Sequence, residues 1–486
     1  MRAVALGLAV FVLLGCAPNA AEPQAVAWTD CADLIPFGPD GTRPEIARRL
    51  DVGCGTLEVP LDHEHADGQK ISLKLIRLHH REQTDRIGSL VLNPGGPGAS
   101  GVDFAARFVS MATESLLKRF DVIGFDPRGV GESAPIKCNE GADLDRMIDT
   151  IAPVPDEARR MATSCAAKLG ASAQFFNTEA TARDLDLIRR ATGDARLTYA
   201  GFSYGAKLGA TYAHLFPASV RALVLDGPSF PLVDDLGTAE RQLRGFEDAF
   251  DEFARDCATR PSCRELGDLR ALVAKLVTQA QATPLTHENP ADRRRTSGGT
   301  VLHGVLSALY DNARWQPLED ALRLGLKGDG TTFFDLSDAG TGRRRDGTYP
   351  NMIDAGFVIN CTDGATVPTE EQITSTAARW AKDYPLFGVY QAGALYGCRY
   401  WDAPKHPPAT PTAPAAPPIL VIGTVHDPAT PYQGAVELAA TLGSGVLLTS
   451  EGEGHTAYLR SPCVDKLVET YLISGNAPKA GTRCPA

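Results

Sequence analysis

The pentapeptide Gly201–Gly205, with the sequence Gly-Phe-Ser-Tyr-Gly, is the segment whose residue types point most directly to chemistry. It follows the apolar run Leu197–Ala200, which predicts a buried strand, and it opens the small-residue-rich segment Tyr204–Phe216, which predicts a helix. A Gly-x-Ser-x-Gly sequence between a strand and a helix places the serine on a sharp turn at the edge of a sheet. The helix N-terminus behind that turn favours negative charge, such as that of an oxyanion. We therefore predict that Ser203 is the nucleophile of an acyl-transfer reaction.

A serine hydroxyl of ordinary pKa needs a general base, and the base needs an acid that orients it. Where a serine turn of this kind is used, the acid and then the histidine follow along the chain, after later strands. Asp427 follows the predicted strand Ile419–Gly423, and His455 follows the predicted strand Val446–Thr449. We therefore predict that Asp427 and His455 complete the catalytic triad. Asp226, which follows an earlier strand, is the alternative acid.

An oxyanion also needs backbone donors, and a glycine-rich turn is placed to provide one. The turn Asn93–Gly98 has the sequence Asn-Pro-Gly-Gly-Pro-Gly and follows the predicted strand Ser89–Leu92. Because most of this turn carries no side chain, its N–H groups can approach a substrate oxygen. We predict that the amides of Gly96 and Tyr204 form the oxyanion hole, in which one donor is worth about 10²–10³ in rate.

Eight short apolar runs have the length and β-branched content of the strands that must position these groups. From the third run onward most are followed by helical patterns, which is typical of right-handed crossovers in a parallel sheet. The predicted fold class is therefore α/β, with a mostly parallel eight-stranded sheet. The runs are Gly55–Leu61, Ile71–Leu78, Ser89–Leu92, Val122–Asp126, Leu197–Ala200, Ala222–Asp226, Ile419–Gly423 and Val446–Thr449.

The long segment between the sixth and seventh runs has no clear strand series. An apolar stripe at helical spacing begins there at Leu243 and continues over several predicted helices. We predict that residues 231–403 form a mainly helical lid inserted into one core. The first part of that core is 29–230 and the second part is 404–486.

The N-terminus has the pattern of an export signal. Arg2 precedes the apolar run Ala3–Gly15, which is too short to span a bilayer core that needs about 20 residues. The run ends in Leu-Leu-Gly followed by Cys16, which resembles the lipobox of bacterial lipoproteins. We expect 1–15 to be a lipoprotein signal peptide and 16–28 a tether acylated at Cys16, anchored to the outer face of the cell membrane. Partial secretion, or an ordinary secretory signal with a chance cysteine, is the alternative.

Ten further cysteines remain in the sequence, and no two of them have the Cys-x-x-Cys spacing of a zinc or redox motif. An even number in an exported chain favours structural disulfides. The simplest pairing joins neighbours along the chain. It gives Cys31–Cys54, Cys138–Cys165, Cys257–Cys263, Cys361–Cys398 and Cys463–Cys484.

Composition excludes some classes of protein. The 486 residues are 43% hydrophobic and 22% charged, which is typical of a globular chain. The formal net charge of −11 gives no electrostatic basis for binding nucleic acid. We expect no cofactor, because the sequence has no phosphate loop or dinucleotide fingerprint, and no metal, because no cysteine pair has zinc-ligand spacing and the clustered histidines have another explanation. The clustered histidines flank a predicted hairpin turn and are expected to face solvent; they are His63, His65, His79 and His80.

Five motifs are distributed over nearly the whole chain after the tether. They are Asn93–Gly101, Phe120–Gly129, Gly201–Gly205, Ile359–Asp363 and His426–Tyr432. Together they resemble the secreted actinobacterial α/β-hydrolases of the tripeptidyl-aminopeptidase type, a family related to prolyl aminopeptidases that includes mycobacterial lipoprotein serine proteases. Many relatives have the sequence His-Gly-Gly-Pro-Gly, and this chain has Pro94 in place of the histidine. The backbone donors are unchanged by this difference, but the fine specificity of those relatives is less transferable to this chain.

This resemblance implies an α/β-hydrolase fold, a lid over the cleft, and the triad already named. It also implies that Thr430 helps to shape the site. The expected activity is release of tripeptide-type N-terminal peptides from a peptide or protein substrate. Such an enzyme needs an anion for the substrate's ammonium group, and Asp363 and Glu240 are the candidates, with surface or structural roles as their alternatives.

Two other functions remain open. A carboxylesterase or lipase acting on envelope esters would use the same triad. A non-catalytic envelope lipoprotein that binds a partner is the more remote alternative. The sequence leaves the oligomeric state and the preferred side chains undetermined.

Overall fold

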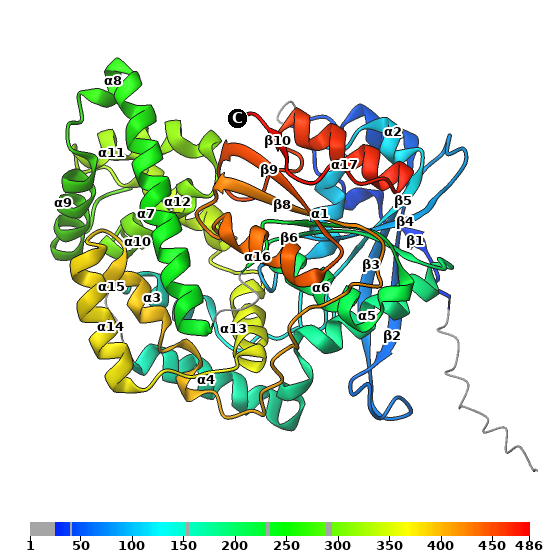
Figure 1. Cartoon of the computed structure of the whole chain (residues 1–486). Coiled ribbons are helices and arrows are strands. Elements are labelled where there is room, and N and C mark those ends of the chain that lie inside the picture. Colours follow the sequence, from blue (N-terminus) through cyan, green and yellow to red (C-terminus); the bar gives the residue numbers. More distant parts are fainter. Residues whose placement is uncertain (1–24, 39–40, 152–154, 230–233, 288–293) are drawn as a thin grey trace, which may run out of the picture.

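The structure is a computed structural model that describes residues 25–38, 41–151, 155–229, 234–287 and 294–486. In these residues the central element is one twisted sheet of ten strands (Figure 1). The strand order is β1-β2-β3-β5-β4-β6-β7-β8-β9-β10, antiparallel from β1 to β5 and parallel from β5 onward. The strands are β1 (Thr29–Asp30), β2 (Leu50–Pro60), β3 (Lys70–His80), β4 (Gly88–Asn93), β5 (Phe120–Phe125), β6 (Leu197–Phe202), β7 (Val220–Asp226), β8 (Ile419–His426), β9 (Gly445–Glu453) and β10 (Thr482–Cys484).

All eight predicted strands are present in this sheet. Two short strands, β1 and β10, extend its edges to ten strands. Segments of two and three residues show no periodicity, so they leave no signal in the sequence. The fold is the α/β-hydrolase fold.

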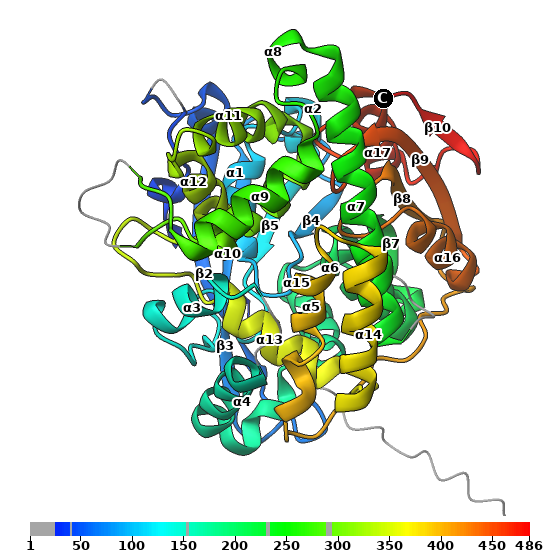
Figure 2. The ribbon, with the colours of Figure 1, turned by 90° about the vertical axis from the view of Figure 1, so that its left-hand side faces the viewer.

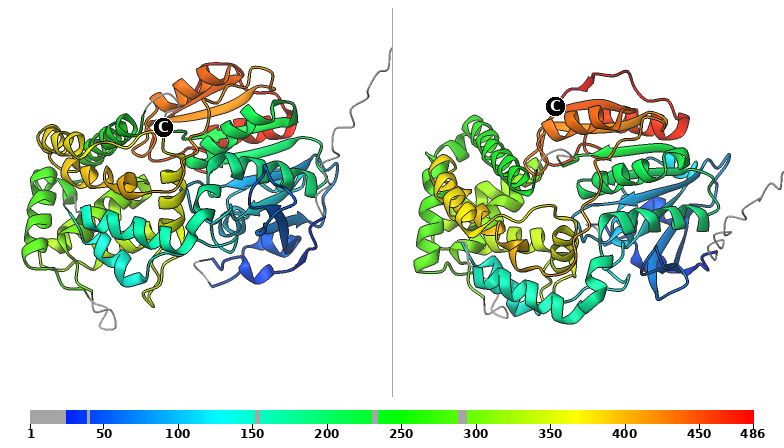
Figure 3. Two further views of the ribbon diagram at one scale, coloured as in Figure 1. Left: turned by 90° about the horizontal axis from the view of Figure 1, so that it is seen from below. Right: turned by 60° about the horizontal axis from the view of Figure 1, so that its bottom comes forward.

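Helices cover both faces of the sheet, and each face has its own hydrophobic core (Figure 3). Helices α1 and α17 pack on one face, and α5, α6 and α16 pack on the other. The core helices are α1 (Gly101–Phe108), α2 (Glu114–Leu117), α5 (Thr178–Ala191), α6 (Tyr204–Leu215), α16 (Gln433–Leu442) and α17 (Pro462–Ser474).

A helical cap with a hydrophobic core of its own lies between β7 and β8 in the sequence. In Figure 2 this cap faces the viewer, and the long helix α7 runs along it. Its α-helices are α7 (Asp235–Thr259), α8 (Pro261–Arg264), α9 (Leu269–Ala282), α10 (Gly298–Leu309), α11 (Trp315–Gly325), α12 (Thr331–Thr341), α13 (Met352–Asp363), α14 (Glu370–Asp383) and α15 (Gly388–Ala394).

Two helices from the first part of the core also pack against the cap. They are α3 (Gly141–Ile148) and α4 (Pro155–Leu169), which lie beside α10 and α13 (Figures 1 and 2). The sequence did not predict this packing of α3 and α4 on the cap. The periodicity of an amphipathic helix indicates which face is buried, but not which element covers that face.

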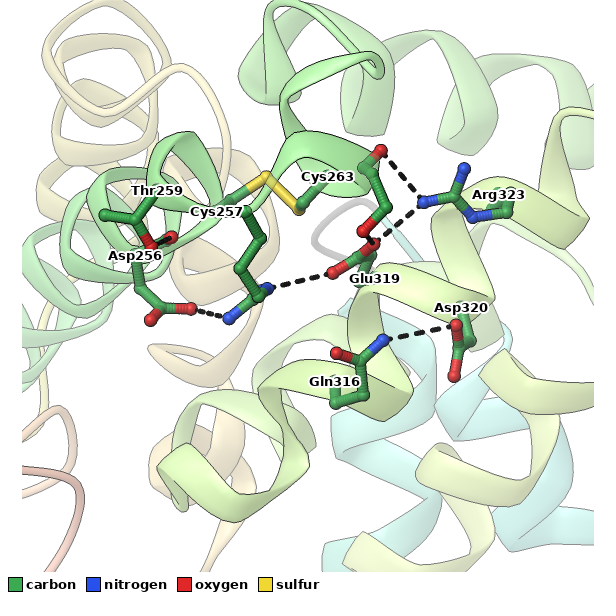
Figure 4. Close-up of a disulfide and its surroundings, with 10 residues drawn as sticks. Asp256, Cys257, Thr259, Cys263, Gln316, Glu319, Asp320 and Arg323 are labelled. Atoms are coloured by element: carbon green, nitrogen blue, oxygen red, sulfur yellow. Dashed lines mark hydrogen bonds and ion pairs between the residues drawn. A yellow bond between two sulfur atoms is a disulfide. The ribbon is translucent and has the colours of Figure 1, made fainter.

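The described residues contain five disulfides, and these join the neighbouring cysteines of the simplest pairing. The bridge Cys257–Cys263 holds the turn between α7 and α8 (Figure 4). Beside it the buried carboxylate of Glu319 accepts hydrogen bonds from Ser262 Oγ at 2.8 Å and Arg323 Nη2 at 2.8 Å. These contacts attach the turn to α11.

Several predictions concern segments outside the described residues. These are the signal peptide 1–15, the acylated Cys16 with most of its tether, and the lid boundary at 230–231. Within the described ranges, no helix combines the length and apolar character needed to cross a membrane.

Candidate active site

Ser203 occupies a strained turn between β6 and α6. Its φ of +56° lies in a region that residues with a side chain rarely adopt. A Cβ at Gly201 would lie 2.3 Å from the carbonyl oxygen of Gly205, and a Cβ at Gly205 would lie 2.6 Å from that of Asn93. The two glycines of the pentapeptide therefore allow the strand, the turn and the helix to pack closely.

Asp427 and His455 meet at the carboxyl ends of β8 and β9. His455 Nδ1 lies 2.9 Å from both carboxylate oxygens of Asp427. Asp427 is buried and also accepts hydrogen bonds from the amides of Ala429, Thr430 and Thr456 at 2.9, 2.8 and 3.2 Å. An acceptor fixed in this way places the imidazole proton on Nδ1 and leaves Nε2 as the basic nitrogen.

Thr430 lies against the same pair. Its hydroxyl donates to Asp427 Oδ2 at 3.1 Å and lies 3.2 Å from His455 Nδ1. Thr430 also lines the cavity beside Ser203. The structure therefore brings Thr430 into the site, as the family resemblance implied.

Asp226, the alternative acid, lies behind the histidine loop and is fully buried. Its Oδ2 accepts hydrogen bonds from the amides of Ala457 and Tyr458 at 2.9 and 2.8 Å, and it makes none to the imidazole. Burial raises the pKa of Asp226 to about 7. The geometry thus favours Asp427 as the residue that orients His455.

The turn that carries Ser203 and the loop that carries His455 both contact the C-terminal end of β7. The Ser203 amide donates to the carbonyl oxygen of Asp226 at 2.8 Å. A Cβ on the next residue, Gly227, would lie 3.1 Å from Thr456, which follows His455. Among the described residues Ser203 Oγ makes no hydrogen bond to His455 Nε2, a contact that often tightens only when substrate binds.

Two backbone amides beside Ser203 are free to bind an oxyanion. Within the described part of the chain, neither the amide of Gly96 nor that of Tyr204 donates to a protein acceptor. The turn after β4 packs directly on the serine turn, because a Cβ at Gly95 would lie 2.3 Å from the carbonyl oxygen of Phe202. Both predicted donors therefore lie beside the proposed nucleophile.

A cavity of about 530 Å³ opens beside Ser203, between the core and the cap. Core residues on its wall include Gly96, Tyr204, Lys207 and Thr430. The cap contributes helices α7, α13 and α15 to the opposite wall. A volume of this size suits a short peptide rather than a folded protein surface.

Asp363 lies on the cavity wall, but its charge is already balanced. Its carboxylate accepts hydrogen bonds from the Thr178 amide at 2.9 Å, the Thr178 hydroxyl at 2.5 Å and Lys207 Nζ at 2.8 Å. The Thr178 hydroxyl also contacts the Tyr204 hydroxyl at 2.7 Å. Asp363 therefore connects cap helix α13 to Tyr204, the residue that follows Ser203.

Glu240, the other candidate for the ammonium site, is not brought to the cavity. It lies on α7, where Arg379 donates to both of its oxygens at 2.8 Å and Arg244 lies at 3.4 Å. These arginines lower the pKa of Glu240, and Arg379 is the main cause. The sequence shows that Glu240 is charged, but its ion pair with Arg379 depends on how α14 packs beside α7.

Two cap residues of the site were missed by sequence analysis. Asp235, at the start of α7, lines the cavity and accepts only weak hydrogen bonds from Thr366, at 3.3 and 3.4 Å. Among the described residues it has no ion-pair partner. Tyr310, which follows α10, contacts His455 through its carbonyl group and its ring. No motif marks either residue, because both reach the site only through the packing of the cap.

Comparison with known proteins gives consistent matches along the chain. A family model described as TAP-like protein matches residues 384–484. The serine protease Hip1 of Mycobacterium tuberculosis is 36% identical over 99% of this chain and 96% of its own length. Carboxylesterase B of the same species is 35% identical over 96% of this chain and 91% of its own. The tripeptidyl aminopeptidase of Streptomyces coelicolor is 31% identical over 96% and 86%.

Proposed function

Since this chain belongs to the family of serine hydrolases that includes Hip1, carboxylesterase B and the tripeptidyl aminopeptidases, we propose that it is an exported aminopeptidase releasing short, tripeptide-type peptides from polypeptide N-termini. The observation that carries this proposal is the cavity beside Ser203. Its core wall holds Gly96 and Tyr204, the predicted oxyanion donors, and its cap wall holds Asp235, which has no ion-pair partner among the described residues.

The reaction proceeds through an acyl-enzyme. His455 Nε2 takes the proton of Ser203 as the hydroxyl oxygen attacks the peptide carbonyl carbon. The amides of Gly96 and Tyr204 stabilise the tetrahedral oxyanion, and His455 then donates the proton to the leaving amine. Water activated by the same imidazole hydrolyses the ester in the reverse sequence. Asp427 keeps the proton of His455 on Nδ1 and stabilises the imidazolium.

A fluorophosphonate probe tests the nucleophile directly. The wild-type chain is expected to be labelled at Ser203, and Ser203→Ala is expected to abolish labelling. Labelling that persists in Ser203→Ala would refute the assignment. Absence of labelling in a folded wild-type chain would instead favour the non-catalytic binding lipoprotein.

The substrate's ammonium group is assigned to Asp235. Asp363 is neutralised by Lys207 and Glu240 is held by two arginines, so Asp235 is the described cavity acid whose charge is uncompensated. An extended tripeptide places its N-terminus about 10 Å from the scissile bond, which requires an anchor on the far side of a cavity rather than next to the serine. A carboxylate from the cap meets that requirement.

Asp235→Asn should separate substrates with a free amine from those without one. We expect KM for a free tripeptide amide to rise about tenfold, as for loss of one charge-assisted hydrogen bond, with little change for the N-acetylated peptide. Glu240→Gln, an acid of the same helix outside the cavity, is the matched control and should leave both values near wild type. Equal effects on free and acetylated substrates would remove the ammonium role.

A carboxylesterase is the second candidate, favoured by the likeness to carboxylesterase B. The triad serves esters and amides equally well. If short acyl esters are hydrolysed efficiently and acetylation of the peptide amine changes nothing, the esterase function replaces the aminopeptidase function.

Export and anchoring are the remaining part of the proposal. The N-terminal apolar run and the five disulfides support an oxidising compartment outside the cytoplasm. Labelling of cells with a palmitate analogue should mark the wild-type protein and not Cys16→Ala. A Cys16→Ala variant that stays labelled and membrane-bound would contradict acylation at this residue.

A further inference from the structure

Tyr310 joins the cap to the histidine of the proposed triad. It is the residue after α10, and its carbonyl oxygen accepts a hydrogen bond from the His455 amide at 2.9 Å. Its ring lies 5.6 Å from the imidazole, centre to centre, at an interplanar angle of 84°. The cap therefore contacts both the backbone and the side chain of His455.

The histidine loop is shaped to receive this residue. Gly454 has a φ of +92°, and a Cβ there would lie 3.1 Å from the Tyr310 carbonyl oxygen. Arg460, from the same loop, donates to that oxygen at 3.5 Å and pairs with Asp311. On the cap side, the ring of Phe246 packs against the Tyr310 ring at 5.4 Å.

We propose that Tyr310 is a positioning residue for the catalytic base, so that the cap is part of the catalytic apparatus and not only a cover over the cavity. The proposal rests on the triad given above. Asp427 fixes the imidazole of His455 at one atom, Nδ1, and a ring that is fixed at a single atom can still rotate about that contact. The edge-to-face contact restricts that motion, so the imidazole keeps the one orientation in which Nε2 serves as the base for Ser203. Proton transfer requires such alignment to within about 0.5 Å and 10–20°.

The ring and not the hydroxyl carries this role. Among the described residues, the Tyr310 hydroxyl makes no hydrogen bond, whereas the ring contacts both His455 and Phe246. Replacement by phenylalanine keeps these contacts, and replacement by alanine removes them while retaining the backbone carbonyl. The two substitutions therefore isolate the contribution of the ring.

The test compares Tyr310→Phe and Tyr310→Ala in the full chain. We expect Tyr310→Phe to keep kcat within about twofold and Tyr310→Ala to lower kcat about 10- to 100-fold, the range for misplacement of a catalytic group, with KM little changed. The rate of fluorophosphonate labelling should fall in parallel, because it reports Ser203 activation without a peptide substrate. Leu326→Ala, at an exposed apolar cap residue away from the cavity wall, is the control and should change neither quantity.

Thermal unfolding and a second variant separate positioning from loss of structure. Asp311→Asn removes the ion pair with Arg460 and keeps the ring, so it should lower kcat in the same direction by a smaller factor. Full activity of a folded Tyr310→Ala would overturn the proposal, as would a loss in Tyr310→Phe equal to that in Tyr310→Ala. A rise in KM alone would also overturn it, since that marks a substrate contact. Failure of the proposed function is seen separately, as labelling that persists in Ser203→Ala.

Discussion

At the scale of single residues, the site depends on carboxyl groups whose surroundings give them different properties. Asp427 accepts hydrogen bonds from three backbone amides and contacts the imidazole, whereas Asp226 is buried behind the histidine loop and accepts hydrogen bonds from the amides of Ala457 and Tyr458. Asp226 ends β7 and Asp427 follows β8, at the same edge of the sheet, so the sequence left both open as the orienting acid. Only the direction of each side chain distinguishes them.

The raised pKa of Asp226 predicts a pH-dependent stability. Because burial raises the pKa to about 7, the folded state holds more protons than the unfolded state between about pH 4 and about pH 7. The contribution of Asp226 to stability therefore falls as pH rises through this window. We expect Asp226→Asn, which does not ionise, to show a flatter dependence of Tm on pH than wild type by a few degrees.

Thermal scans at several pH values would measure this difference. If Asp226→Asn and wild type have the same slope of Tm against pH, Asp226 does not titrate in this window.

At the scale of elements, cap and core are connected at both ends of the reaction centre. Tyr310 contacts His455, the proposed base, and Asp363 of α13 reaches Tyr204 through Thr178. The eight main strands were predictable because each is a buried apolar run of sufficient length. The docking of α3 and α4 on the cap was not, because it depends on which amphipathic faces meet.

Asp363→Asn should weaken the connection between α13 and the nucleophile turn. We expect a loss of about 1–3 kcal/mol in stability, since Lys207 loses its charged partner, together with a lower kcat as Tyr204 loses its support. Denaturant unfolding and steady-state kinetics measure the two effects. Asp235→Asn is the control with unchanged stability, and a destabilised Asp363→Asn with full kcat would show that the network does not act on the oxyanion donor.

At the scale of the whole molecule, the five disulfides of the described residues each join cysteines that are neighbours in the cysteine order, and they lie in both the sheet domain and the cap. Each closes a short stretch of chain, and the bridge Cys361–Cys398 closes the longest, with a separation of 37 residues. The bridge Cys257–Cys263 closes the shortest, with a separation of 6 residues. Neighbour pairing was predictable because proximity in sequence favours proximity in space.

The two bridges should differ in their contribution to stability. In the chain-entropy account, a longer closed loop restricts the unfolded chain more, so removal of Cys361–Cys398 should cost about 1–2 kcal/mol more than removal of Cys257–Cys263. Paired Cys→Ala variants compared by urea unfolding would measure the difference. A larger loss for Cys257–Cys263 would mean that the packing around Glu319, and not loop length, decides the effect.

The sequence by itself determined the eight main strands, the serine turn and the loops that carry Asp427 and His455, the proposed partners of Ser203, because each of these features is local. Strand periodicity, a glycine pattern and a loop after a strand can all be recognised within a few consecutive residues. Only the tertiary structure decided that Glu240 is paired with arginines, that Asp235 lines the cavity and that Tyr310 contacts His455. These properties belong to pairs of residues far apart along the chain, and they exist only once the cap has packed on the core.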